Sequence, residues 1–536
     1  MFSLWTAFIF MSLAPWAAAE DCVPGPVSLS LTNTTLSTGK LQRGISLKVG
    51  TPQQQFTFLP KWDNNNTFLY GPNCDSLNLV KTNDACITFR GGIYGNKSDS
   101  RGTLASSIKP PPDLWSSTTY DIFTDNVNLN INKSLQAFPL ASPKDIKSWD
   151  TQGYDPQNII GLGSGSTIID ACRKAGTIAS DSIGFFWGLD GVLDKDQSKG
   201  SFVLGGYDRA KTFGDGYTLP LSDRSDCPTG MIVSIADIVL NFVNGTDTSL
   251  FPDSKGTILT ACLIPERPML MDMPRTPYFD NLLDAIGNEE FGRSTGVDWW
   301  NVILNPSMSM FTGDITFTLD NNMDITIPNR QLVVPERYID DNGNLAINSS
   351  LPVIRINSLQ NTTSQVLPNL GRYFLTGAYV LFNRDAKEFT LWQANPTSSE
   401  DLVAVNEKNE VFEATQSCAK VPATSLPPPT SVPSSGSDND GKPDGSNSSS
   451  KSSSSLSAGA IAGIAIGCVA IIAIILGFLW WRLILRRKSK AETQRSISQE
   501  DCLAGNGGDG VMSIKHSPLM LQEMPSESRG VVELPT

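Results

Sequence analysis

The chain contains one histidine, His516, which lies close to the C-terminal end. The rest of the chain therefore lacks the imidazole that Ser-His-Asp catalysis, Cys-His catalysis and His-ligated zinc sites require. The nine cysteines include no Cys-x-x-Cys pair, so a cysteine-rich metal site is not expected either. Carboxylate chemistry, ligand binding or no chemistry at all remain, and the sequence predicts no metal and no cofactor.

The side chains that could do such chemistry belong to an acidic chain. Its 536 residues hold 41 Lys and Arg against 54 Asp and Glu, which gives a formal charge of −13. Nucleic-acid partners are not expected, because phosphate recognition needs a basic face. The length allows two or more structural units with a substantial core.

Segments at both ends direct the chain to a membrane. Residues 1–19 hold no charged side chain and end in Ala17-Ala18-Ala19, which predicts a secretory signal peptide. Residues 458–481 are uncharged and end in Trp480-Trp481, and a helix of this length spans a bilayer. Basic residues follow at once, so the positive-inside rule predicts a single-pass type I protein whose C-terminal tail is cytoplasmic.

Two further segments have the composition of linkers. Residues 421–457 are rich in Ser, Pro, Gly and Asp, which predicts an extended, O-glycosylated stalk. Residues 482–536 are polar and predict a disordered tail, so the ectodomain comprises residues 20–420. A type I chain without a retrieval signal at its end is expected in the plasma membrane with its ectodomain extracellular; the vacuolar membrane is the alternative.

Cysteines and glycosylation sequons agree with export. Seven cysteines lie in the predicted extracellular part, so at least one is free or pairs with another chain. We predict a disulfide between Cys74 and Cys86, which would close a short loop after a strand, and the other pairings stay open. Eight Asn-x-Ser/Thr sequons predict N-glycosylation at surface loops. They begin at Asn33, Asn65, Asn96, Asn132, Asn244, Asn348, Asn361 and Asn447.

Between residues 41 and 394 the hydrophobic pattern is mostly that of β-strands. Alternating hydrophobic residues predict strands at 45–49 and 56–58, joined by the turn Gly50-Thr51-Pro52. The same alternation predicts a hairpin formed by residues 315–319 and 325–327. Expected helices are few and short. One of them covers Pro277 to Ile286, with proline at its start and Gly287 after its end. The pattern therefore predicts a long all-β ectodomain.

Four stretches resemble, in order, elements of the pepsin-like aspartic peptidases. They are Val49-Gly50-Thr51-Pro52-Gln53-Gln54-Gln55-Phe56, Ile159-Ile160-Gly161-Leu162-Gly163, Gly200-Ser201-Phe202-Val203-Leu204-Gly205-Gly206-Tyr207-Asp208, and Phe374-Leu375-Thr376-Gly377 running on to Val380-Leu381-Phe382-Asn383. The resemblance implies two similar β lobes, an N-lobe at about 40–205 and a C-lobe at about 206–395, with a ligand cleft between them.

The resemblance also implies a mechanism that this chain is not equipped to perform. The family uses two aspartates, one per lobe, each in an Asp-Thr/Ser-Gly loop, and the two carboxylates share a proton. Neither Asp-Thr-Gly nor Asp-Ser-Gly occurs in the chain. Without gaps, the first aspartate position falls on Lys61. A two-residue insertion would place Asp63 there, but Asn65 would then replace the required glycine and a glycan on its sequon would fill the cleft.

The second lobe departs from the motif in the same way. The aspartate position falls at about Pro265, which has no carboxylate and no backbone donor. Glu266 is the nearest acid, and we expect it to form a surface pair with Arg267. Asp247-Thr248-Ser249 mimics the motif, but it follows Asn244-Gly245, a hairpin-turn signal, and lies too early in the chain.

Three hypotheses follow. The first is a catalytically inactive, membrane-anchored pseudopeptidase that binds a peptide or cell-wall component; in this it resembles degenerate, membrane-anchored members of the family found in fungi. The second is an active aspartic endopeptidase that works at acid pH, with Asp63 as one catalytic acid. The third is a glycosylated surface protein that has a structural role and no ligand.

Overall fold

The computed structural model describes residues 22–72, 80–113, 115–144, 156–252, 256–359 and 366–413. No helix within these ranges is long and apolar enough to cross a membrane. The predicted signal peptide, stalk, membrane helix and tail lie outside them, as do Cys74, Asn361 and Asn447.

The described unit consists mostly of β-strands, as the alternating pattern predicts. A seven-stranded sheet begins it, with β3 (Leu41–Val49) and β4 (Gln54–Lys61) near its centre. Ile45 pairs with Phe58 and Leu47 with Phe56, and these side chains are at most 1% exposed, which confirms the two predicted strands. The other strands of this sheet are β2 (Leu31–Thr35), β5 (Gly102–Thr103), β6 (Tyr120–Asn130), β7 (Lys133–Pro143) and β8 (Asn158–Gly161).

An eight-stranded sheet and a four-stranded sheet follow in the chain. The predicted hairpin is present as β19 (Asp314–Leu319) and β20 (Asp324–Ile327). The other strands of the larger sheet are β13 (Ile232–Asn241), β14 (Asp247–Ser249), β15 (Leu259–Leu263), β16 (Met271–Pro274), β23 (Ile356–Leu359) and β24 (Asn369–Leu370). The smaller sheet consists of β17 (Glu290–Arg293), β18 (Val302–Leu304), β21 (Val333–Ile339) and β22 (Leu345–Ile354).

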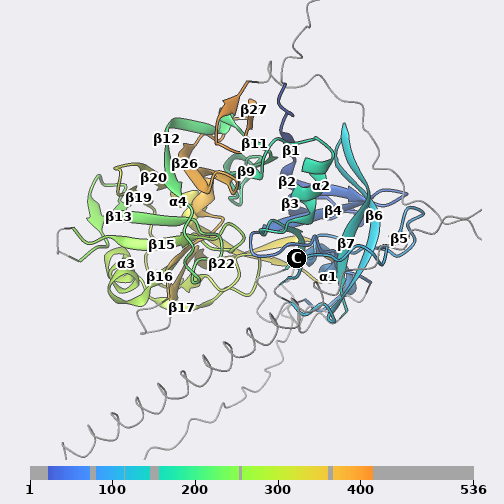
Figure 1. Ribbon diagram of the computed structural model, residues 1–536. Coiled ribbons are helices and arrows are strands. Elements are labelled where there is room, and N and C mark those ends of the chain that lie inside the picture. The colour runs from blue at the N-terminus through green and yellow to red at the C-terminus, as the bar shows by residue number, and fades with distance from the viewer. Residues whose placement is uncertain are drawn as a thin grey trace, which may run out of the picture. The chain divides into compact units, whose positions relative to one another are not determined.

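A six-stranded sheet joins the beginning, middle and end of the described chain. Its order is β1-β10-β9-β25-β26-β12. The bounds are β1 (Val27–Leu29), β9 (Ser182–Phe186), β10 (Ser201–Leu204), β12 (Thr212–Pro220), β25 (Ala378–Asn383) and β26 (Glu388–Ala394). Beside it, β11 (Gly206–Asp208), β27 (Leu402–Val405) and β28 (Val411–Phe412) form a three-stranded sheet. We call the described residues up to 205 the N-terminal half and the later ones the C-terminal half; Figure 1 shows their large sheets on opposite sides of the unit.

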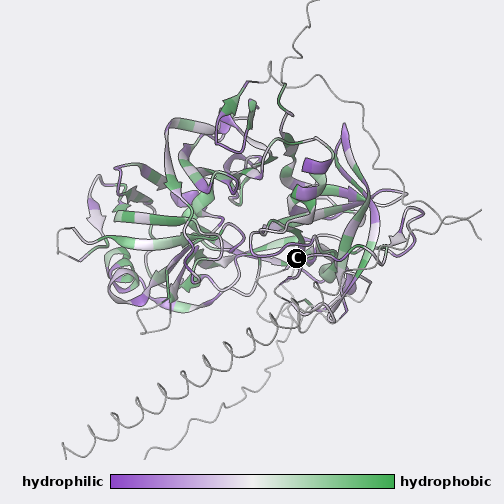
Figure 2. Cartoon of the chain, in the orientation of Figure 1, coloured by the Kyte–Doolittle hydropathy of each residue, from purple (hydrophilic) through white to green (hydrophobic). Residues whose placement is uncertain are grey.

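Helices are few and short. They are α1 (Asn83–Phe89), α2 (Thr167–Lys174), α3 (Asp280–Ile286) and α4 (Asn329–Leu332). The predicted helix at 277–286 is a wide π-type turn, Arg275–Phe279, continued by α3. Gly287 ends α3 with φ +62°, a left-handed conformation in which glycine carries no Cβ penalty. Hydrophobic residues concentrate along the strands (Figure 2), and one buried hydrophobic cluster includes residues of both halves.

The disulfides agree in part with the sequence. Cys227 and Cys262 are bonded, a pairing that the sequence left open. Cys22 and Cys86 each form a disulfide as well. Cys74 lies outside the described residues, so the predicted Cys74–Cys86 pair stays a prediction. Cys172 is free and buried; the sequence predicted that at least one exported cysteine is free or pairs with another chain. Burial raises the pKa of the Cys172 thiol to about 12.

Five charged side chains form a buried arginine–aspartate cluster between the halves. Its members are Arg43, Asp190, Asp298, Arg337 and Arg355, each at most 9% exposed. Arg337 Nη1 lies 2.8 Å from Asp190 Oδ1, and its Nε lies 2.9 Å from Asp298 Oδ2. Arg355 Nε lies 2.9 Å from Asp298 Oδ1. Arg43 and Asp190 come from the N-terminal half and the other three from the C-terminal half, so the cluster ties the halves together.

The guanidinium groups keep both aspartates ionised. Burial by itself raises the pKa of Asp190, but Arg337, Arg43 and Arg355 outweigh it and lower that pKa to about 2. Arg337 and Arg355 likewise outweigh burial at Asp298 and lower its pKa. An acid whose folded-state pKa lies below its unfolded value of about 3.9 adds stability that is complete above that value. The contribution of Asp190 is therefore lost only as the pH falls from about 4 to about 2.

We predict that Asp298→Asn lowers the free energy of unfolding at neutral pH by about 3–5 kcal/mol, because Arg43, Arg337 and Arg355 then share a single buried carboxylate, that of Asp190. Chemical denaturation followed by tryptophan fluorescence measures the change. Asp284→Asn is the matched control: Asp284 is exposed on α3, and its substitution creates no sequon and should change stability by no more than about 0.5 kcal/mol. Equal effects of the two substitutions would contradict a stabilising role for the cluster.

Candidate functional site

Two turns that follow parallel-paired strands form the centre of the candidate site. In the N-terminal half β4 ends at Lys61, Trp62 and Asp63 form a turn, and β4 pairs in parallel with β8. In the C-terminal half β15 ends at Leu263, Pro265 and Glu266 form a turn, and β15 pairs in parallel with β24. Each half thus presents a short turn at the end of a buried strand.

The first turn holds an ion pair in place of a single acid. Lys61 Nζ lies 3.8 Å from Asp63 Oδ1, and the two side chains are only 13% and 23% exposed. The same ammonium lies 5.8 Å from the centre of the Trp115 ring. Trp62 between them is buried and packs edge-on against Phe185, a residue of the six-stranded sheet. The pair is therefore held on a rigid support.

The second turn supplies a buried acid, which corrects the expected surface pair of Glu266 with Arg267. Glu266 is only 7% exposed. Burial raises the pKa of its carboxyl to about 7; the Asp63 carboxylate adds to the rise and the Lys61 ammonium opposes it. The structure therefore brings Lys61, Asp63 and Glu266 into one electrostatic group, while Pro265 is buried and contributes no ionisable side chain.

The residues after Asp63 fix the first turn against the rest of the N-terminal half. Asp113 Oδ1 accepts hydrogen bonds from the backbone amides of Asn65 (2.6 Å) and Asn66 (3.2 Å). A Cβ atom on Gly161 would lie 2.4 Å from the Asn66 carbonyl oxygen, so only glycine allows this close approach. Asn64 is fully buried, and neither polar atom of its side chain has a hydrogen-bond partner.

The sequon at Asn65 is folded into this support. Asn65 Nδ2 donates to the Pro112 carbonyl oxygen, and Oδ1 accepts from the Gly165 amide at 2.8 Å. Thr67, the hydroxyl residue of the sequon, is 1% exposed. Asn33, Asn96, Asn132 and Asn244 are exposed, and Asn348 is half-buried.

A pocket of about 320 Å³ lies between the two halves, which we call the inter-half pocket. Gln42, Phe89 and Gln157 line it from the N-terminal half, and the C-terminal half contributes Pro268, Trp299, Glu336, Tyr338, Asn348 and Arg372. The Arg372 amide donates to the Arg267 carbonyl oxygen at 2.9 Å, so the pocket adjoins the turn that carries Glu266.

The tip of the β21–β22 hairpin crosses from the C-terminal half and holds one side of this pocket. Thr82 Oγ1 donates to the Asp341 carbonyl oxygen at 2.5 Å and Thr88 Oγ1 to that of Gly343 at 2.9 Å. Lys40 Nζ donates to Asn344 Oδ1 at 2.8 Å. We call these three contacts the hairpin clasp. They fix the pocket wall that Glu336 and Tyr338 provide.

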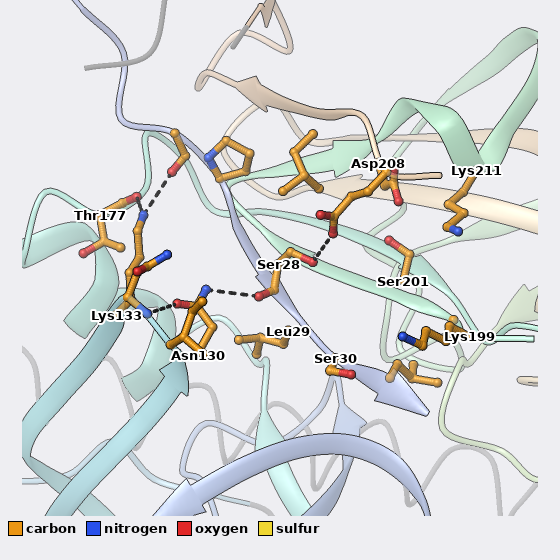
Figure 3. Close-up of a pocket in the computed structure, with 18 of the residues that line it drawn as sticks. Ser28, Leu29, Ser30, Asn130, Lys133, Thr177, Lys199, Ser201, Asp208 and Lys211 are labelled. Carbon is orange, nitrogen blue, oxygen red and sulfur yellow. Dashed lines mark hydrogen bonds between the residues drawn. The ribbon is translucent and has the colours of Figure 1, made fainter. Parts of the chain in front are cut away.

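A larger groove of about 1420 Å³ runs along β1, and its lining does not include Lys61, Asp63 or Glu266. Figure 3 shows polar groups of the groove that bond to their own neighbours: Ser28 Oγ donates to Glu400 Oε1 at 2.8 Å, and Lys133 Nζ donates to the Thr177 carbonyl oxygen at 3.2 Å. Lys211 also donates to a carbonyl oxygen, that of Thr397. These side chains of the groove are therefore already used in contacts within the protein.

The C-terminal stretch that resembles the family contains no counterpart of β8. Phe374–Thr376 forms a 3-10 turn that leads into β25. The strand that pairs in parallel with β15 is β24, a few residues earlier. Asp247-Thr248-Ser249 lies on the hairpin strand β14, paired with β13, in agreement with the predicted hairpin turn before it.

No known protein-family profile matches the chain, and no curated protein is similar to it.

We predict that the stability of the protein falls as the pH rises from about 4.5 to about 7, because the folded state keeps a proton on Glu266 that the unfolded state has released. Glu266→Gln should reduce this fall and make the protein more stable than wild type above neutral pH. Melting temperatures across this range measure the effect. Glu289→Gln, at an exposed position, should leave the pH profile unchanged; a wild-type profile in Glu266→Gln would contradict the assignment.

We also predict that Asn65 is unglycosylated while exposed Asn33, Asn96, Asn132 and Asn244 carry glycans. A glycan on Asn65 would have to displace the Pro112 contact, and the buried Thr67 is inaccessible in the folded state. Mass spectrometry of peptides from the full-length protein, after enzymatic release of glycans in ¹⁸O-labelled water, reports each site. Full occupancy at Asn65 would show that the turn is built differently around a glycan.

Proposed function

We propose that the chain is a membrane-anchored pseudopeptidase: a protein of pepsin-like fold that binds a peptide between its two halves without hydrolysing it. The predicted signal peptide and membrane helix place the described unit outside the cell, at the plasma membrane. The observation that carries the proposal is the Lys61–Asp63 ion pair facing the buried Glu266.

The arrangement of strands supports the pepsin-like fold. In each half, a buried strand ends in a turn and pairs in parallel with a strand from later in the chain: β4 with β8, and β15 with β24. The six-stranded sheet built from distant segments joins the halves. These features agree with the two-lobed architecture that the four sequence stretches imply, with one turn from each half at the centre.

The loss of catalysis follows from the charge at the centre. A shared-proton dyad needs two carboxylates that compete for one proton and position a water molecule between them. Here Lys61 Nζ lies 3.8 Å from Asp63 Oδ1, and the position opposite is Pro265, which has no carboxylate. A carboxylate that faces an ammonium forms an ion pair and does not share a proton with a second carboxylate.

One observation favours a second candidate, an acid endopeptidase. Asp63 and Glu266 come from different halves, and they interact strongly enough for the Asp63 charge to raise the pKa of Glu266. Because the pKa of Glu266 is raised to about 7, this carboxyl carries a proton at acid pH. A protonated carboxyl close to a second carboxyl group from the other half is an arrangement that general acid–base hydrolysis can use.

We predict that the full-length protein, purified in detergent, does not cleave a denatured protein substrate at acid pH. Wild type is compared with Asp63→Asn, Glu266→Gln and the control Asp284→Asn, which lies on α3 outside the candidate site. Cleavage lost in the first two variants and kept in the control would establish the acid endopeptidase and end the pseudopeptidase proposal. Cleavage that survives both site substitutions would overturn both candidates.

A further inference from the structure

The inter-half pocket contains a buried cation that no acid neutralises. Arg372 follows β24 and is only 4% exposed. Among the residues that the structure describes, none forms an ion pair with it, and its Nε and Nη1 atoms have no hydrogen-bond partner. Its guanidinium instead lies 5.0 Å from the Trp187 ring centre and 5.5 Å from that of Tyr373. Leaving a charge buried and unpaired is costly, so such a group is a candidate for a ligand contact.

Arg372 also adds to an excess of positive charge. Trp187 is shared with Arg43, whose guanidinium lies 5.3 Å from the same ring and belongs to the buried arginine–aspartate cluster. That cluster contains three arginines and two aspartates, so Arg372 makes four cations against two anions. Glu336 is also near this cluster: burial raises the pKa of its carboxyl, and the Asp298 carboxylate adds to the rise. If Glu336 is counted as ionised, the four cations face three anions, which leaves one cation in excess. In an acidic chain, this buried region is electrostatically complementary to an anion.

The other groups of the pocket favour an amphiphilic molecule. Phe89, Trp299 and Tyr338 provide aromatic surface, and Gln42, Gln157 and Asn348 provide amide groups. Aromatic faces pack against apolar side chains, and amides can donate to and accept from peptide groups. A planar guanidinium matches a carboxylate, whose two oxygens accept its parallel N–H groups.

The hairpin clasp indicates how such a ligand would be seated. Three contacts hold the β21–β22 tip against α1 and the start of β3, so this side of the pocket is closed by the protein's own chain. A polypeptide running continuously through the pocket would have to displace them. A ligand that enters by one end would not.

We propose that the inter-half pocket binds the C-terminal carboxylate of a short peptide, with Arg372 as the residue that pairs with the carboxylate. This inference rests on the proposed peptide-binding function and specifies its ligand. The last one or two side chains of the peptide contact Phe89, Trp299 and Tyr338, and their peptide groups contact the surrounding amides.

Equilibrium dialysis with detection by mass spectrometry tests the proposal on the full-length protein in detergent. One probe is a pool of N-acetylated tripeptides of random sequence with free carboxylates, and the other is the same pool with C-terminal amides. The acid pool should be retained and the amide pool should not. Arg372→Gln should weaken retention of the acid pool roughly tenfold or more, the usual cost of losing a charge-assisted contact. Arg330→Gln, the same substitution at an exposed arginine, should retain it as wild type does.

A second variant separates binding from folding. Arg372→Lys keeps the charge but not the planar fork, so it should bind the acid pool more weakly than wild type while melting at a similar temperature. Equal retention of both pools, unaffected by Arg372→Gln, would leave peptide binding standing and overturn the carboxylate assignment. Retention of neither pool would overturn both. A third dialysis uses a glucuronate-containing disaccharide as the probe. If it is retained in an Arg372-dependent way and no peptide is retained, the pocket binds an acidic sugar and the peptide proposal is overturned.

Discussion

Compensation of buried charge is the constraint on which the rest of the structure depends. Taking five ionised groups out of water between the two halves costs far more than any single contact returns, so the cluster is stable only as a complete set. Arg337 contacts both aspartates and stands at its centre. Because its members come from both halves, the charge balance also fixes how the halves face each other. The turn that carries Glu266 and the pocket lined by Arg372 inherit their geometry from that arrangement.

Much of the strand framework could be predicted because the residues that decide it are local. Alternation at Ile45, Leu47 and Val49 reports a buried face directly, and each of these residues is buried in β3. The buried charges were missed because their partners are distant in sequence: Asp190 and Arg337 are 147 residues apart. One local signal was present, since Arg355 stands between Ile354 and Ile356 in a strand pattern that has no exposed face for it.

The candidate site shows the same division. Sequence alone could name Lys61, Asp63 and Pro265 as positions of interest, because motif positions are counted along the chain. It could not show that Glu266 turns inward, since the preference of a glutamate for the surface is overridden by packing that only the fold reveals. The sequence gives no indication of the role of Arg372, because that role depends on the lack of an acidic partner near its guanidinium. A group defined by an absent partner becomes recognisable only when its neighbours are known.

The unpaired thiol of Cys172 has a consequence for how this protein could be studied. The residue is fully buried, and with its pKa raised to about 12 almost none of it is present as thiolate at neutral pH. Alkylating reagents react with the thiolate, so modification at this position requires the surrounding structure to open first. The rate at which Cys172 becomes labelled, followed by peptide mapping, therefore measures how often the N-terminal half opens under native conditions.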